Sequence, residues 1–256
     1  MNTHISPSII MRTWDFGETD LLISFFTLDK GRLKGVAKGA RKSQKRFVNC
    51  LDLFCLTDVE YMLGKKGDLH FLHSCKLVNS FPDLRSDFAV LSLASYMVEL
   101  TEILFPLGVV DKGMFELLKS AFLSLNKDIG IDLIRLYFEA KAMALGGYKI
   151  NLDKCCICGR RYTGKGKAVF KQSKGGIACM KCQQVSRRFP GLEPDTVSEL
   201  RTIQKTHWGE LTSFMPTDEM IRQLKDVFKL HLEYRTGKRL KSAKYLESIH
   251  SPNSIT

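Results

Sequence analysis

The sequence contains no run of 18 apolar residues that could cross a membrane. Its first segment, Met1 to Gly17, lacks the basic region followed by an apolar stretch that marks a secretory signal. We therefore expect no membrane span, no membrane partner and a cytoplasmic location. The eight cysteines of such a chain are expected to be reduced thiols, which are free to bind metal rather than form disulfides.

Motifs of several enzyme classes are also missing. There is no phosphate-binding GxxxxGK[S/T] loop and no HExxH motif. The one tight acidic group near basic residues is Asp15, Glu18 and Asp20, and carboxylates of this kind hold the Mg²⁺ of nucleases. Glu18 and Asp20 lead into a predicted strand, so we interpret them as turn residues. The sequence therefore favours a protein that is not an enzyme, and a Mg²⁺-dependent nuclease or nucleotide hydrolase is the less favoured alternative.

Acidic residues are scarce beside basic ones, with 27 Asp and Glu against 39 Lys and Arg and a net charge of +12. Such an excess favours a polyanionic partner. Nucleic acid is the partner that we expect, and an acidic lipid surface is the competing possibility.

Two stretches contain no Asp or Glu at all. The first runs from Lys30 to Arg46, on a predicted strand and the loop that follows it. A solvated strand face usually mixes both signs of charge, so this stretch is a candidate nucleic-acid contact rather than an ordinary polar face. Its candidate residues are Arg32, Lys34, Lys38, Arg41, Lys42, Lys45 and Arg46. The second runs from Lys154 to Arg188, and a small module with only positive charge is suited to lie near phosphates.

Cysteines within the second stretch form two CxxC hooks, Cys155 with Cys158 and Cys179 with Cys182, twenty residues apart. The spacing predicts one tetrahedral zinc ion with four thiolate ligands, because each two-residue gap lets both sulfurs reach one metal at ~2.3 Å. Protein ligands fill all four positions, so we expect structural rather than catalytic zinc. Cys156 has no partner at hook spacing and is interpreted as a bystander.

Residues 1 to about 80 favour short strands separated by turns. The predicted strands are at 21–27, 32–37, 54–61 and 69–73. Several short strands in so few residues predict a small β-barrel, closed or nearly so. Cys50, Cys55 and Cys75 lie among apolar residues and are expected to pack in the core.

The pattern changes at Phe81-Pro82. Apolar residues then recur at helical spacing in four segments, 88–105, 114–125, 131–145 and 218–234. Thr196 and Glu199 match a capping box that would begin a further short helix. We therefore predict an α+β protein with a barrel domain at 1–80 and an all-α domain at 81–256, into which the zinc module is inserted at 153–188.

The chain resembles a known family along nearly its whole length. GETD from Gly17, FT from Phe26, Gly31 and VAKGARK from Val36 look like the amino-terminal OB-fold of the bacterial recombination mediator RecO. The order continues with helices, a CxxCG…GGxxCxxC zinc module and LKS from Leu240, which is similar to the closing helix of that family.

The resemblance implies a DNA-binding recombination mediator in DNA repair without enzymatic activity. Such proteins bind single- and double-stranded DNA regardless of sequence and anneal complementary strands. With the partner RecR they help to load the RecA recombinase onto DNA coated by single-stranded-DNA-binding protein (SSB), and they contact the acidic carboxyl-terminal tail of SSB. Association with the nucleoid is implied as well.

Three questions stay open from the sequence. Phe47 is either a base-stacking residue beside the basic loop or part of the core. A zinc-ribbon protein that binds RNA or acts in transcription is the alternative function. We expect the SSB tail to bind the helical part near 88–105 and 218–234, although these faces could instead pack on each other.

Overall fold

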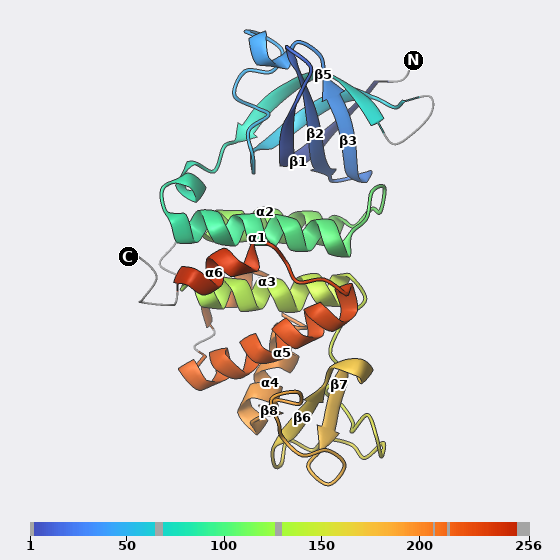
Figure 1. Cartoon of the computed structure of the whole chain (residues 1–256), viewed down its shortest axis with the longest axis vertical. Coiled ribbons are helices and arrows are strands. Elements are labelled where there is room, and N and C mark those ends of the chain that lie inside the picture. Colours follow the sequence, from blue (N-terminus) through green and yellow to red (C-terminus); the bar gives the residue numbers. More distant parts are fainter. Residues whose placement is uncertain (1–2, 65–68, 126–129, 207, 214–215, 250–256) are drawn as a thin grey trace. The chain divides into compact units, whose positions relative to one another are not determined.

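The computed structural model describes residues 3–64, 69–125, 130–206, 208–213 and 216–249. The chain forms two compact units, Met1–Asn126 and Lys127–Thr256 (Figure 1). In the first unit a barrel is followed by two helices, and the second combines helices with a small sheet. The predicted domain boundary at residue 80, which falls just after the last barrel strand, stays a prediction.

Five strands close the barrel in the order β1-β2-β3-β5-β4. They are β1 (Thr3–Phe16), β2 (Asp20–Thr27), β3 (Gly31–Ala37), β4 (Leu56–Met62) and β5 (Leu69–Asn79). β3 and β5 run parallel, and the other neighbours run antiparallel. This closed five-stranded barrel is OB-like, so the predicted α+β fold with an amino-terminal OB barrel is confirmed. The four predicted strands correspond to β2–β5, while β1 was not predicted individually.

β1 closes the barrel because it pairs with β4 through its first half and with β2 through its second half. A bulge between Ile10 and Arg12 marks the change of partner, and a bulge bends a strand and increases its twist. Ile10, Phe25 and Tyr61 point inward and are 0% exposed. Alternation of inward apolar and outward side chains thus builds the core of the barrel.

Helices α1 (Phe88–Leu104) and α2 (Lys112–Ser124) lie beside one end of the barrel and confirm two predicted helices (Figure 1). Each begins after an aspartate, Asp87 or Asp111, whose carboxylate accepts hydrogen bonds from N–H groups of the first turn. The ring of Phe26 on β2 lies against two phenylalanine rings of this helical segment. This aromatic contact buries one end of the outer barrel surface.

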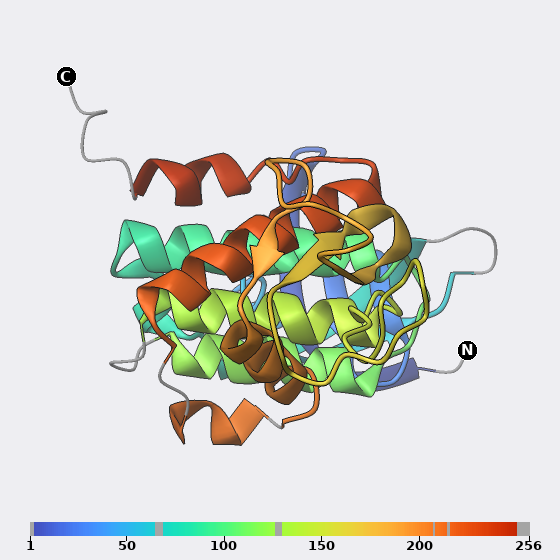
Figure 2. The same ribbon diagram turned by 90° about the horizontal axis from the view of Figure 1, so that it is seen from below.

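The second unit combines helices with a three-stranded sheet (Figure 2). Its elements are α3 (Ile131–Leu145), β6 (Ala168–Lys171), β7 (Gly176–Cys179), β8 (Gly191–Leu192), α4 (Pro194–Ile203), α5 (Asp218–Thr236) and α6 (Ala243–Ile249). Helices α3 and α5 confirm their predictions, and an ion pair of 2.7 Å between Asp132 and Lys225 joins them.

The predicted capping box is wrong. Helix α4 begins at Pro194, and Thr196 lies inside its first turn with 1% exposure. Proline suits the first helical position because its fixed φ is already helical and its missing N–H would have no intrahelical partner. The N-cap residue is Glu193, so the motif of Thr196 and Glu199 lies three residues too late to be the cap.

Helix α5 holds the small sheet through a buried histidine. His231 is 0% exposed, its Nε2 lies 2.8 Å from the Tyr148 carbonyl oxygen, and its ring meets Phe170 of β6 edge-on. Burial lowers the pKa of His231 to about 4, against the opposing effect of the hydrogen bond to Tyr148. The ring is therefore neutral near pH 7, and its Nε2–H donates to that carbonyl.

Candidate nucleic-acid interface and metal site

The four hook cysteines converge on one point in the second unit. The Sγ atoms of Cys155, Cys158, Cys179 and Cys182 all lie within 4.8 Å of one another, and those of Cys158 and Cys179 are 3.9 Å apart. Four sulfurs at ~2.3 Å around a tetrahedral metal would be about 3.8 Å apart, so the cluster fits an ion of this size. Cys156 is not a member of the cluster.

Backbone turns place these sulfurs. Gly159 has φ +75°, and its N–H donates to the Cys155 carbonyl at 3.0 Å. In the second hook the Cys182 N–H donates to the Cys179 carbonyl at 2.9 Å. Burial raises the pKa of Cys155, but backbone N–H groups that include that of Cys179 outweigh it and lower the pKa to about 6. A thiolate is the form that binds metal, so these backbone N–H groups favour the binding form of Cys155. The hydrogen bond to Cys179 has the opposite effect on Cys182 and raises its pKa to about 12.

The basic loop of the first unit, which we define as residues 38–46, follows β3 and contains a short 3₁₀ helix at Ala40–Lys42. Five of the seven candidate residues lie on it and are exposed to solvent. They are Lys38, Arg41, Lys42, Lys45 and Arg46. The structure thus brings most of the predicted contact residues together on one segment.

Hydrogen bonds hold the basic loop to the barrel. The Asp20 carboxylate accepts the Gly39 N–H at 2.8 Å, and the Arg41 N–H donates to the Thr19 carbonyl at 3.0 Å. The Arg46 guanidinium donates to the Lys38 carbonyl at 2.8 Å. These contacts fix the loop backbone, so the exposed cations are displayed from a defined surface. They also give Asp20 a positioning role for the loop, although the structure places this residue at the start of β2 rather than in the preceding turn, where Glu18 lies.

The other two candidates lie on β3, apart from the loop. Lys34 is partly exposed on the outer face of the barrel. The side chain of Arg32 is 16% exposed and forms an ion pair of 3.5 Å with Glu102 of α1, which also pairs with Arg12 at 3.0 Å. Burial lowers the pKa of Arg32, while Glu102 opposes that effect. Arg32 is thus engaged in joining the barrel to α1.

Phe47 is 5% exposed and belongs to the barrel core together with Cys50 and Cys55, so it is not available for stacking. These two cysteines pack in the core as predicted, and Cys75 packs partly buried against the same cluster. An aromatic residue that the sequence did not single out lies in the exposed position instead. Phe71 of β5 is 42% exposed, and the Lys38 Nζ lies 5.9 Å from its ring centroid.

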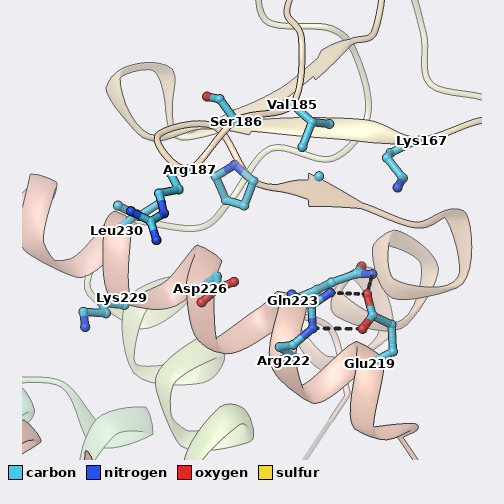
Figure 3. Close-up of a pocket in the computed structure, with 12 residues that line it drawn as sticks. Lys167, Val185, Ser186, Arg187, Glu219, Arg222, Gln223, Asp226, Lys229 and Leu230 are labelled. Atoms are coloured by element: carbon cyan, nitrogen blue, oxygen red, sulfur yellow. Dashed lines mark hydrogen bonds and ion pairs between the residues drawn. The ribbon is translucent and has the colours of Figure 1, made fainter.

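A groove of about 460 Å³ lies in the second unit, between α5 and the segment that leads from the second hook to β8 (Figure 3). Cations line both walls, among them Arg187 and Lys167 from the module and Arg222 and Lys229 from α5. Lys167, Arg222 and Lys229 are each paired with a glutamate, at 2.6, 2.6 and 3.0 Å. Apolar surface comes from Val185, Pro190 and Leu230, and acidic groups from Glu219 and Asp226. The groove thus combines a basic rim with apolar patches.

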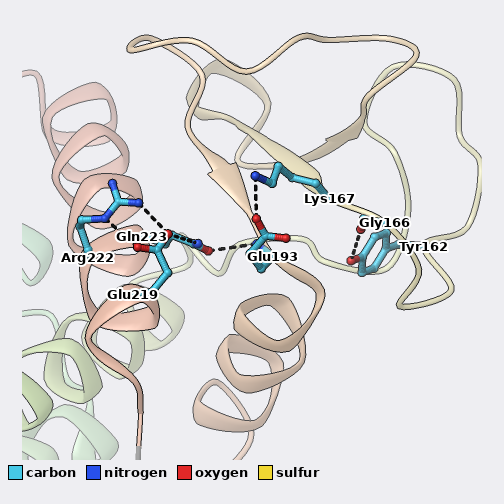
Figure 4. Close-up of polar contacts among 7 residues, drawn as sticks. All are labelled: Tyr162, Gly166, Lys167, Glu193, Glu219, Arg222 and Gln223. Atoms are coloured by element: carbon cyan, nitrogen blue, oxygen red, sulfur yellow. Dashed lines mark hydrogen bonds and ion pairs between the residues drawn. The ribbon is translucent and has the colours of Figure 1, made fainter.

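A polar network joins the two walls of this groove (Figure 4). Lys167 of the module pairs with Glu193 at 2.6 Å, and the Glu193 N–H donates to the Gln223 side chain at 3.0 Å. Gln223 in turn donates to Glu219 at 2.7 Å, and Glu219 accepts two hydrogen bonds from the Arg222 guanidinium. The network fixes the module against α5 and sets the width of the groove.

Comparison with known proteins agrees with this architecture. Residues 1–81 match the family model described as Recombination protein O N terminal, and residues 85–244 match the model Recombination protein O C terminal. The chain is thus a recombination protein built from these two parts. It belongs to the RecO family of DNA repair proteins.

Relatives match along almost the full chain. The DNA repair protein RecO of Syntrophobacter fumaroxidans (strain DSM 10017 / MPOB) is 32% identical over 257 residues, which is 98% of this chain and 100% of the relative. Those of Desulfatibacillum aliphaticivorans and Syntrophus aciditrophicus (strain SB) are 30% identical over 248 residues and 29% identical over 250 residues. These matches cover 95% and 96% of this chain, and 96% of each relative.

Within the part of the chain that the structure describes, no helix combines the length and the apolar character needed to cross a membrane.

Proposed function

We propose that the protein acts in DNA repair by binding single- and double-stranded DNA without reading sequence and by annealing complementary strands. With RecR it would help RecA to replace SSB on DNA, at the nucleoid in the cytoplasm. The observation that carries the proposal is the basic loop, whose exposed cations project from a backbone held by Asp20 and Thr19. Cations at fixed positions neutralise phosphates regardless of base sequence.

The proposed role involves no catalysed reaction. A Mg²⁺-dependent nuclease needs carboxylates that converge on the metal. In the acidic group near the loop, Asp20 accepts the Gly39 N–H, and Asp15 lies 3.8 Å from the Arg41 guanidinium. Both carboxylates therefore serve the loop that binds phosphate. For the four-cysteine cluster we propose zinc in a structural role, because thiolates fill every position around a tetrahedral ion.

The groove beside α5 is our proposed site for the SSB tail. An acidic peptide with apolar side chains needs cations around an apolar floor, and Arg187 and Leu230 supply both kinds of contact. Titration of the full chain with the tail peptide tests this assignment. Arg187→Ala should weaken binding, whereas Lys205→Ala, which removes an exposed cation elsewhere in the same unit, should not. Equal affinity of the two variants would refute the site.

The direct test of function starts from single-stranded DNA coated with SSB. The protein should bind this complex and accelerate annealing to a labelled complement, and Mg²⁺ should cause neither DNA cleavage nor nucleotide hydrolysis. Failure to anneal coated DNA would contradict the mediator role. A large preference for structured RNA over single-stranded DNA would instead support the zinc-ribbon alternative.

A further inference from the structure

Cross-strand register aligns an outward row of side chains on the barrel. Trp14 of β1 lies opposite Leu22 of β2, Leu22 lies opposite Val36 of β3, and Val36 lies opposite Phe71 of β5. Directly paired residues project from the same face of a sheet. Their chain neighbours Ile23, Ala37 and Leu72 belong to the core, so the row that starts at Trp14 faces outward.

The two ends of this row are exposed aromatic rings. Trp14 is 43% exposed and Phe71 is 42% exposed, while Val36 between them is only 3% exposed. Three strand spacings of about 4.8 Å separate the ends, which puts the Cα atoms of the two residues about 14 Å apart along the sheet. Single exposed apolar residues are common and need no explanation. Here, by contrast, two exposed aromatic rings and the apolar side chains between them form one continuous row.

Positive charge borders the row. Lys34, Val36 and Lys38 follow one another on the same side of β3 and its continuation, and Lys38 lies beside the Phe71 ring. Among the residues that the structure describes, this row and the row of Arg12, Ser24, Lys34 and Leu69 on one side of it contain no carboxylate. On the other side Asp20 lies opposite Phe16, and its carboxylate accepts the Gly39 N–H of the basic loop. The basic loop begins directly after β3, at Lys38. A polyanion bound by the loop could therefore continue across the row.

We propose that Trp14 and Phe71 are stacking platforms for unpaired bases of single-stranded DNA, with Lys34 and Lys38 placed for the flanking phosphates. An aromatic ring stacks on any base, so the contact suits a protein that does not read sequence. Bases in a duplex are already stacked and paired, so this row gives a preference for the single strand that phosphate contacts alone do not give. The inference rests on the proposed DNA-binding function and assigns residues to it.

Fluorescence gives a direct test, because Trp14 and Trp208 are the two tryptophans of the chain. In a Trp208→Phe protein, Trp14 is the reporter. Binding of oligothymidylate should quench its emission, since a stacked base lies on the ring. Duplex DNA and an abasic oligodeoxyribose phosphate of equal length should bind without this quenching.

Affinity measurements complete the test. Trp14→Ala and Phe71→Ala should each weaken oligothymidylate binding by about 5- to 150-fold, the range expected when one base stack is removed. Duplex binding should be unchanged, and Trp14→Phe and Phe71→Tyr should restore the single-strand affinity. An unchanged thermal transition in each alanine variant shows that the fold is intact.

The failures of the two proposals can be told apart. A wild-type protein that binds no DNA overturns the proposed function itself. Normal DNA binding with unquenched Trp14 and unaffected alanine variants overturns only the stacking assignment. Unaffected DNA binding together with loss of RecR or SSB binding would instead make the row a protein-docking face, which also overturns it.

Discussion

The basic loop at residues 38–46 and the module at residues 154–188 are both rich in Lys and Arg and free of acidic residues. The loop is held by hydrogen bonds to the barrel, and Phe47, just after it, lies in the barrel core. The module is held on one side by its sheet against α5, and on the other side the sulfur atoms of four cysteines converge. The two segments thus have similar charge but are held in place by different contacts. The stability of the loop and the stability of the module should therefore respond to different perturbations.

Metal removal should separate the two regions most strongly. Cys179→Ser should lose the metal and loosen the module, because thiolate–metal bonds contribute on the order of 10 kcal/mol in small zinc domains. The barrel should keep its thermal transition. Metal analysis and limited proteolysis measure the two effects. Cys156→Ser is the matched control, and it should keep one zinc per chain. Loss of zinc in the control, or its retention in Cys179→Ser, would refute the ligand set.

The helix contacts of the two units should differ in their response to pH. His231 has its folded pKa lowered to about 4, below the ordinary value of 6.5, so its contribution is present above pH 6.5 and is lost as the pH falls towards 4. The loss should be about 1 kcal/mol between pH 7 and pH 5.5, and about 3 kcal/mol in total.

Urea unfolding followed by Trp208 in a Trp14→Phe background measures this loss in the second unit. His231→Gln should remove most of the pH dependence over that range, with metal content verified at each pH. An identical pH slope in both proteins would show that the histidine does not titrate in this way.

In the first unit, the contact between a strand and a helix is an ion pair, which Arg32 of β3 forms with Glu102 of α1. Glu102→Gln should destabilise this unit by about 2 kcal/mol, because Arg32 would keep a largely buried charge without its partner. Thermal unfolding followed by Trp14 in a Trp208→Phe background measures the change. Glu116→Gln breaks the exposed pair with Lys119 and should stay within about 0.5 kcal/mol of wild type. Equal effects of the two substitutions would mean that burial of the Glu102 pair is unimportant.

Local sequence patterns predicted some features of the fold and of the candidate site, but not others. The cysteine spacing was enough to predict the four-cysteine cluster. Each CxxC pair is local in the sequence, so the contact between the two pairs was the one long-range contact to infer. The alternation of β3 placed Arg32 and Lys34 on the same face, but it could not show that α1 brings Glu102 to Arg32 and leaves Lys34 partly exposed. Likewise, Phe47 and Phe71 both lie near basic residues, and only tertiary packing separates the buried ring from the exposed one.

The salt dependence of single-stranded DNA binding tests the central claim most directly. Lys42→Ala/Lys45→Ala removes two cations of the basic loop, and Lys112→Ala/Lys119→Ala removes two from α2 in the same unit. The log–log slope of affinity against salt should flatten by about 0.7 for each phosphate that the protein no longer neutralises, in the loop variant alone and equally for all sequences. Equal slopes for the two variants, or a strong sequence preference that persists in the loop variant, would contradict DNA binding through this loop.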